Sequence, residues 1–421
     1  MRLRFHAKFA LALTISAIVL SVAHTSPRRT ATVRSSKACC SAAASLPATP
    51  LGSVTFGGGS VNVIFNSDTA YACGSSNIGV IDISNPSAPR LLSSFAGSDL
   101  GGNAIVGCFQ VGQSLVVPVN TQSGFVYDIS DRRNLKSQAR FTPAFPFSGF
   151  VSFLGNTGWF TTDSFTYTPG PNTISTQSGY FFSVDFTDPT HPAALGNLSS
   201  DPSQPASSTA SPRFGSMTIA GDTAYVLSTT STGPDTNGGQ GAFQIVNISN
   251  PSAPVAQGQI IIPQATTLTS VSPVQNNIVL VTGNTKSWRN PGVNPRNPGN
   301  LNFQFTGVLT LSAFDVSDPH NPALVSTRCT DIAASFGYSM APLGGGFFAL
   351  AVGPPADDAV AFGADPRGQL LLVDARDPGN LGLFSMGFVA KLSGLAVNGG
   401  TLYAATGDGL STFQLPDLGG L

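Results

Sequence analysis

The chain has 421 residues, a formal net charge of −1 and only 10% charged residues. Soluble domains usually carry about 25% charged residues, and a nucleic-acid-binding surface needs a concentrated basic stripe. The composition therefore excludes an ordinary nucleic-acid-binding protein. Its 41% hydrophobic residues are enough for a large core.

Residues 1–23 predict a secretory signal peptide. A basic start precedes an apolar stretch over 9–22, and Ser21-Val22-Ala23 forms a small-x-small cleavage site. A transmembrane anchor needs about 20 apolar residues, and this stretch is shorter. We therefore expect a chain with no transmembrane span that is secreted, extracellular or held at the cell surface or in the periplasm.

Residues 24–47 are polar and basic and have no hydrophobic period. They predict a flexible leader or linker before a single domain over 48–421. No apolar period of 3.6 occurs after residue 23, so we expect an all-β fold.

An apolar strand, an acidic or amide residue and a proline-marked turn recur seven times. The intervals between successive anchor residues are 46, 57, 62, 68, 59 and 40. A strand-rich unit of roughly 40 to 50 residues with inserted loops is typical of a β-propeller blade. The copies are GVIDISNPSAP (79–89), FVYDISDRRNL (125–135), FSVDFTDPTHP (182–192), QIVNISNPSAP (244–254), SAFDVSDPHNP (312–322), LLVDARDPGNL (371–381) and STFQLPDL (411–418).

The acidic residue of each copy is interpreted as a turn former rather than a catalyst. Asp and Asn side chains accept hydrogen bonds from backbone amides two residues on, and the following prolines end one strand and open the next as an edge strand. The seventh copy lacks a fourth strand before the chain ends at Leu421. Residues 50–56 (PLGSVTF) resemble 89–95 (PRLLSSF) and predict that missing strand. We expect a seven-bladed ring closed by strands from both ends of the chain.

These repeats resemble the LVIVD-repeat β-propellers, as seen in GVIDISNPSAP, IVNISNPSAP and LLVDARDPGN. The resemblance extends over roughly residues 50–418 and implies a propeller that is secreted or attached to a bacterial surface. It implies no reaction. The long loops between the second and third strands of several units depart from the compact family unit.

When the seven units are aligned with one another, Cys73 and Cys108 each occupy a position that is mostly apolar in the other units. Buried free thiols are the favoured interpretation, and a disulfide between blades 1 and 2 is the alternative. The sequence leaves open whether Cys39 and Cys40 pair with Cys329 or with another chain.

No residue is predicted to be catalytic. Of the four histidines, two lie in the first 24 residues, and His191 and His320 lie in proline-marked turns. No cluster has metal-ligand spacing, and we expect no cofactor and no metal.

The loops between the second and third strands are long in units 3 to 6, over 162–179, 229–242, 284–306 and 353–368. Loops of this kind emerge on one face of a propeller, and function concentrates on loops held by a rigid scaffold. The unit 5 loop carries Trp288, Arg289 and Arg296, and Trp and Arg are enriched at binding hot spots. The sequence therefore predicts a binding module for an extracellular protein or glycan. The alternative is an exported lyase or hydrolase with its site at the channel mouth on the same face.

Overall fold

The computed structural model describes the backbone of thirteen segments between residues 43 and 419. The expected signal peptide at 1–23 and most of the leader lie outside them, as do Arg289 and Arg296. The segments are 43–57, 60–74, 76–96, 105–119, 123–142, 150–166, 176–199, 212–230, 240–262, 267–288, 305–333, 337–354 and 366–419.

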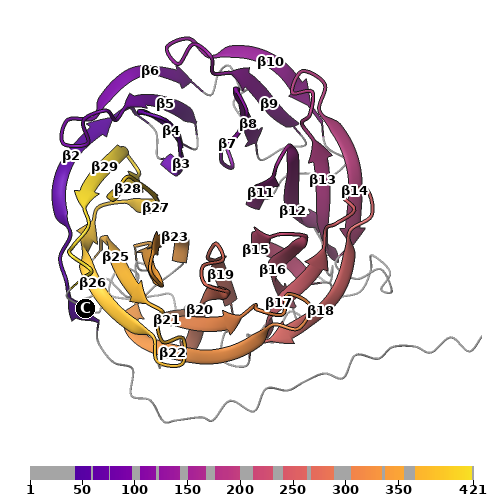
Figure 1. The fold of residues 1–421 in the computed structure, drawn as a ribbon, viewed down its shortest axis with the longest axis vertical. Helices are drawn as coiled ribbons and strands as arrows, with labels where there is room; N and C mark the ends of the chain where they lie inside the picture. Colours follow the sequence, from indigo (N-terminus) through magenta and orange to yellow (C-terminus); the bar gives the residue numbers. More distant parts are fainter. Residues whose placement is uncertain are drawn as a thin grey trace, which may run out of the picture. The chain divides into compact units, whose positions relative to one another are not determined.

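The described segments form seven antiparallel blades around a common centre, with the first strand of each blade innermost (Figure 1). This confirms the predicted seven-bladed β-propeller. From inside to outside the blades are: blade 1, β3 (Ser60–Asn66), β4 (Thr69–Gly74), β5 (Asn77–Asp82), β6 (Arg90–Ala96); blade 2, β7 (Phe109–Val111), β8 (Ser114–Val119), β9 (Ser123–Asp128), β10 (Lys136–Phe141); blade 3, β11 (Phe150–Leu154), β12 (Thr157–Thr166), β13 (Thr176–Asp185), β14 (Ala193–Ser199); blade 4, β15 (Pro212–Ala220), β16 (Thr223–Thr230), β17 (Gln240–Asn247), β18 (Val255–Ile261); blade 5, β19 (Thr267–Val271), β20 (Ile278–Trp288), β21 (Phe305–Asp315), β22 (Ala323–Ala333); blade 6, β23 (Gly337–Gly344), β24 (Phe347–Val352), β25 (Gly368–Asp374), β26 (Gly382–Val389); blade 7, β27 (Leu392–Asn398), β28 (Thr401–Thr406), β29 (Gly409–Gln414), β2 (Thr49–Thr55).

One register rule holds in all seven blades. The first residue of the second strand lies opposite the anchor residue that ends the third strand. The pairs are Thr69 with Asp82, Ser114 with Asp128, Thr157 with Asp185, Thr223 with Asn247, Ile278 with Asp315, Phe347 with Asp374 and Thr401 with Gln414. The repeat seen in the sequence is therefore also the repeat of the hydrogen-bonded ladder.

The apolar core lies between the blades. The described residues form seven clusters of buried side chains, and each cluster joins two neighbouring blades. In one of them Tyr71 and Val80 of blade 1 pack with Leu115 and Val117 of blade 2. Burying one such side chain stabilises the fold by about 1.5–3 kcal/mol. A blade therefore depends on both of its neighbours.

The predicted closure is confirmed, because β2 pairs antiparallel with β29 and completes blade 7. The Thr412 hydroxyl contacts two carbonyl oxygens, at 3.0 Å from Gly52 O and 2.7 Å from Pro86 O, and so ties the closing strand to blade 1. Gly52 is required there, since a Cβ would lie 2.7 Å from Ser87 O.

The chain preceding β2 also joins the ring. A short strand, β1 (Ala44–Ser45), pairs parallel with β26 and adds a fifth strand to blade 6. Leu46 N and Ala48 N donate to Ser385 O and Met386 O at 2.9 and 3.0 Å. The leader expected to end at residue 47 thus overlaps a segment that runs along blade 6 before it closes blade 7.

Shortening the chain from its N-terminus separates these two attachments. A chain that starts at Ala43 should be as stable as one that starts at His24. A start at Thr49 removes β1 and two hydrogen bonds and should lower the free energy of unfolding by about 2 kcal/mol. A start at Gly57 removes β2, exposes the edge of β29 and should cause aggregation. Chemical denaturation and light scattering measure both effects. Equal stability of the Thr49 and Gly57 variants would contradict the closure.

Candidate functional site

The propeller has two unlike faces. We call the face that carries the turns between first and second and between third and fourth strands the turn face. The opposite face carries the connections between second and third strands and the links between blades, and we call it the loop face.

On the turn face, the anchor side chains form the predicted turns. Asp82 Oδ1 accepts hydrogen bonds from Ser84 N and Ser84 Oγ at 3.0 and 2.7 Å, and Asn85 Oδ1 then accepts from Ser87 N at 3.1 Å. The same double turn recurs at Asp128 and Asp131, Asp185 and Asp188, Asn247 and Asn250, Asp315 and Asp318, and Asp374 and Asp377.

These hydrogen bonds stabilise the ionised carboxylates. The Thr190 hydroxyl and then His191 lower the pKa of Asp188 to about 2. Hydrogen bonds from the residue two positions on lower the pKa of the anchor carboxyl in four other blades, at Asp82, Asp128, Asp315 and Asp374. The carboxylates are thus turn formers, as predicted, and each is engaged within its own turn.

The turn face also joins neighbouring blades. The Ser183 hydroxyl of blade 3 donates to Pro251 O of blade 4 at 2.6 Å, and the Ser326 hydroxyl of blade 5 donates to Pro378 O of blade 6. His320 Nδ1 lies 2.7 Å from Gln257 Oε1 of the preceding blade, and His191 Nδ1 lies 2.9 Å from Asp188 Oδ2. His320 therefore contacts the preceding blade, whereas His191 is engaged within its own turn.

Because the folded-state pKa of these carboxyls lies below the unfolded value, their contribution to stability is present above about pH 4 and is lost as the pH falls towards 2. A triple variant, Asp82→Asn with Asp188→Asn and Asp315→Asn, keeps the amide acceptor that blade 4 already uses at Asn247. Its melting temperature should fall less between pH 6 and pH 3 than that of the wild type. Parallel melting curves across this range would contradict the assignment.

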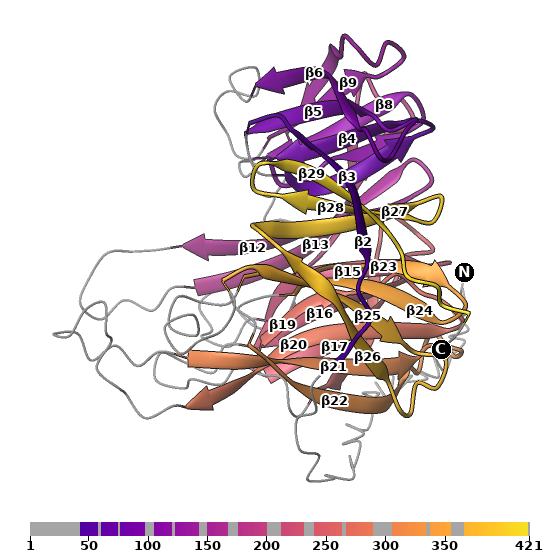
Figure 2. The same cartoon turned by 90° about the vertical axis from the view of Figure 1, so that its left-hand side faces the viewer.

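The loop face differs because the second and third strands of blades 3, 4 and 5 extend towards it; those of blade 4, β16 and β17, have 8 residues each. The strands β12 and β13 have 10 residues each and β20 and β21 have 11, whereas β4 and β5 have 6. Since the turn-face register is the same in every blade, all the additional residues lie at the loop-face end, where the strands of blades 3 and 5 reach furthest on the left of Figure 2. Parts of the expected loops are therefore paired strands.

The predicted binding residues lie at this end of blade 5. Trp288 is the last residue of β20, and its backbone pairs with Phe305 at the start of β21. Arg289 and Arg296 follow it in the chain and lie outside the described residues.

Three cation contacts at the loop-face rim were not predicted. The Arg140 guanidinium lies 5.6 Å from the Phe125 ring centroid and donates to the Ser123 hydroxyl at 3.0 Å. Arg367 lies 5.1 Å from the ring centroid of Phe388, which is 43% exposed. Lys391 Nζ pairs with Asp408 at 2.8 Å. The partners are 15 to 21 residues apart in the sequence. The register between third and fourth strands is the signal that could have revealed the Arg140 and Arg367 contacts, whereas Lys391 and Asp408 lie in the connections that flank β27 and β28.

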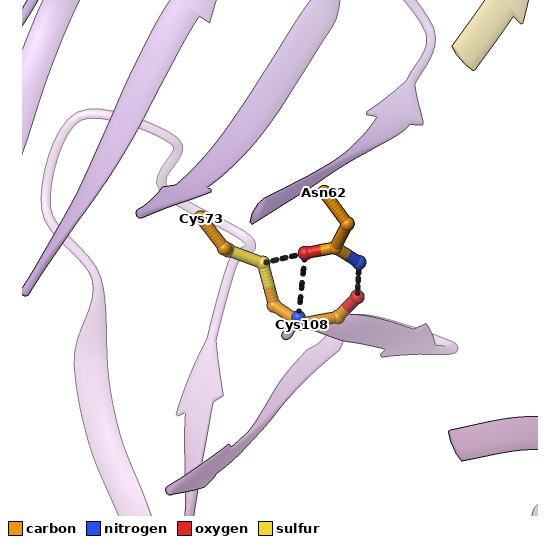
Figure 3. The surroundings of a disulfide bond; sticks show 3 residues. All are labelled: Asn62, Cys73 and Cys108. Atoms are coloured by element: carbon orange, nitrogen blue, oxygen red, sulfur yellow. Dashed lines mark hydrogen bonds between the residues drawn. A yellow bond between two sulfur atoms is a disulfide. The ribbon is translucent and has the colours of Figure 1, made fainter. Parts of the chain in front are cut away.

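Cys73 and Cys108 form a disulfide between blades 1 and 2, with Cα atoms 6.0 Å apart (Figure 3). The favoured prediction of buried free thiols was wrong, and the alternative was correct. Both residues are fully buried, which is why their positions in the repeat look apolar. Cys329 is half-buried, with its Sγ 3.7 Å from Thr330 O, and Cys39 and Cys40 lie outside the described residues.

Asn62 holds the disulfide from the side. Its Nδ2 donates to Cys108 O at 2.8 Å and its Oδ1 accepts from Cys108 N at 3.0 Å (Figure 3). The same bridge between innermost strands recurs where Ser216 Oγ accepts from Val271 N and Ser339 Oγ accepts from Leu395 N. Polar side chains of one innermost strand thus cap amides of the next blade.

Within the thirteen described segments, no group of three His, Cys, Asp or Glu side chains is close enough together to hold a metal ion. The same residues contain no helix long and apolar enough to cross a membrane.

The LVIVD repeat family matches two segments, 69–96 in blade 1 and 238–260 in blade 4. The sheet topology is that of a seven-bladed β-propeller, and the two matches are consistent with an LVIVD-repeat propeller. No curated protein sequence matches it significantly.

Among solved structures, a chain in the crystal structure of a mitotic checkpoint complex has 12% identity and a TM-score of 0.55, covering 97% of this chain and 99% of that one. The N-terminal domain of Nup159 has 12% identity and a TM-score of 0.48, covering 90% and 100%. At 12% identity, the first of these similarities shows the fold alone.

Replacing both bridged cysteines by alanine should lower the free energy of unfolding by about 3–4 kcal/mol, because the bridge closes a loop with a sequence separation of 35. Urea denaturation measures the loss. The control Cys329→Ala should unfold nearly like the wild type. An unchanged midpoint for the Cys73→Ala/Cys108→Ala variant would show that the bridge is not formed in solution.

Proposed function

We propose that this chain is an exported binding module whose loop face receives an extracellular protein or glycan. The observation that carries the proposal is the one-sided growth of blades 3 to 5. Every blade keeps the same register at the turn face, and the strands lengthen only at the loop face. Growth of this kind supports recognition, since it changes one surface and leaves the scaffold unaltered.

The chemistry of the two faces supports the same division. Anchor carboxylates, prolines and both turn histidines are engaged in turns and in contacts between blades. The loop face presents Arg140 and Arg367 stacked on aromatic rings, and Trp288 ends the longest second strand. Arg and aromatic residues are the types enriched at binding hot spots.

Export is supported by the disulfide and by the signal-like residues 1–23. Disulfides form and persist in oxidising compartments and are rare in the cytosol. A protein outside the cytosol that presents an enlarged, aromatic and cationic face would meet proteins and glycans there. No step of a reaction is assigned to any residue.

The test is a protein-binding and glycan-array screen with the chain from His24 onward, repeated with a loop-face variant. Trp288→Ala, Arg289→Ala and Arg296→Ala together should weaken the partner found by at least about 30-fold, since a hot-spot truncation costs about 2 kcal/mol or more. The melting temperature should stay unchanged.

Matched controls lie on the turn face. Arg133→Ala removes an exposed cation, and His191→Ala removes an aromatic ring engaged only within its turn. Both should bind like the wild type. Full affinity in the loop-face variant, or a loss in the control variants alone, would place recognition elsewhere.

A further inference from the structure

The tetrapeptide Asp-Thr-Ala-Tyr occurs twice, at 68–71 in blade 1 and at 222–225 in blade 4. In each copy the Thr and Tyr side chains are two positions apart on one strand and share a face. That face packs against the following blade, since Tyr71 belongs to the apolar cluster between blades 1 and 2 and Tyr225 to the cluster between blades 4 and 5. In blade 3, Trp159 occupies the position of the tyrosine and packs towards blade 4.

The polar tips of these aromatic side chains share one property. Tyr71 Oη, Tyr225 Oη and Trp159 Nε1 are sealed from solvent, and none has a hydrogen-bond partner among the described protein atoms. Buried polar groups in native proteins nearly always have a partner, either protein or ordered water. The two tyrosine hydroxyls, at the same position of the same tetrapeptide, require a common explanation.

Charged groups of the neighbouring turns lie close enough to each tyrosine to act on it electrostatically. Between blades 1 and 2, Arg132 of the second blade donates to Thr69 Oγ1 at 2.9 Å and pairs with Asp68. Burial raises the pKa of Tyr71, and the nearby Arg132 partly opposes that rise. The Tyr71 hydroxyl is therefore protonated at neutral pH and free to donate.

Between blades 4 and 5 the charged groups that act on the tyrosine are carboxylates, without a counterpart of Arg132. The Thr223 hydroxyl donates to Asp222 Oδ1 at 3.3 Å, and Pro319 stands at the turn position that Arg132 has in blade 2. Burial, and then the carboxylates of Asp318 and Asp222, raise the pKa of Tyr225 to about 12. This hydroxyl is also a donor at neutral pH.

We propose that each Asp-Thr-Ala-Tyr tetrapeptide binds one buried water molecule at the junction with the following blade. The water accepts a hydrogen bond from the tyrosine hydroxyl and donates to oxygen acceptors of the surrounding turns, within the roughly three hydrogen bonds that a buried water makes. At the first junction Arg132 and Asp68 neutralise each other and leave no net charge for an ion to balance, and at the second an anion would be repelled by Asp222 and Asp318. A neutral molecule with both donor and acceptor capacity suits both junctions.

The variants Tyr71→Phe and Tyr225→Phe remove only the hydroxyl. If water is bound, each loses its hydrogen bond, and the melting temperature should fall by about 2 °C per substitution. The two losses should add in the double variant because the sites lie in separate blades. A crystal structure of the wild type should show a density peak about 2.6–3.2 Å from each hydroxyl oxygen.

A melting temperature that stays the same or rises in the Tyr→Phe variants would overturn the proposal. A hydroxyl with no partner costs stability, so its removal would leave the melting temperature unchanged or raise it. Clear electron density for the tyrosine side chains with no peak at either hydroxyl would overturn it as well.

Discussion

Apolar packing between neighbouring blades is the interaction on which the rest of this structure depends. Each of the seven buried clusters belongs to two blades, so no blade completes its own core. An open arc would leave two terminal blades with uncovered apolar faces and an unpaired edge. Ring closure by β2 follows from this requirement. The contact of Thr412 with both Gly52 and Pro86 then ties the closing strand to the first blade.

Polar contacts at two levels and a disulfide add specificity to this packing between blades. At the turn face, hydroxyl groups such as that of Ser183 reach the proline carbonyl of the following blade. Around the centre, Asn62, Ser216 and Ser339 cap amides of the next innermost strand. In blades 1 and 2 the disulfide adds a covalent link at the same junction. The turn face therefore contributes to the stability of the ring, while the strands that reach the loop face vary in length from blade to blade.

The repeat was readable from the sequence because its most local feature is also its most constrained. The Asx turn needs an acid or amide at one fixed position, and the proline after it fits only an edge strand, so Asp82 and its counterparts mark every blade. Closure was predictable for a similar reason, since residues 50–56 repeat the pattern of the fourth strand in blade 1.

Features that depend on distant register were not predictable in this way. The Cys73–Cys108 bridge was predicted only as the alternative, because a buried disulfide and a buried thiol both fit an apolar position of the repeat. The attachment of β1 to blade 6 was not predictable because β1 has only two residues, which is too short to show a hydrophobic period. The rim contacts of Arg140 and Arg367 require knowing which residues of two strands lie opposite each other. The polar residues of segments 162–166 and 284–288 predict loops, whereas the structure pairs both segments as strands.

Amide hydrogen exchange followed residue by residue tests the central claim most directly. If packing around a closed ring stabilises the fold, the paired amides of β29 in blade 7 should exchange as slowly as those of β5 in blade 1, both limited by global unfolding. Fast exchange throughout β29 while β5 remains protected would show that the ring opens at blade 7 and would contradict the account.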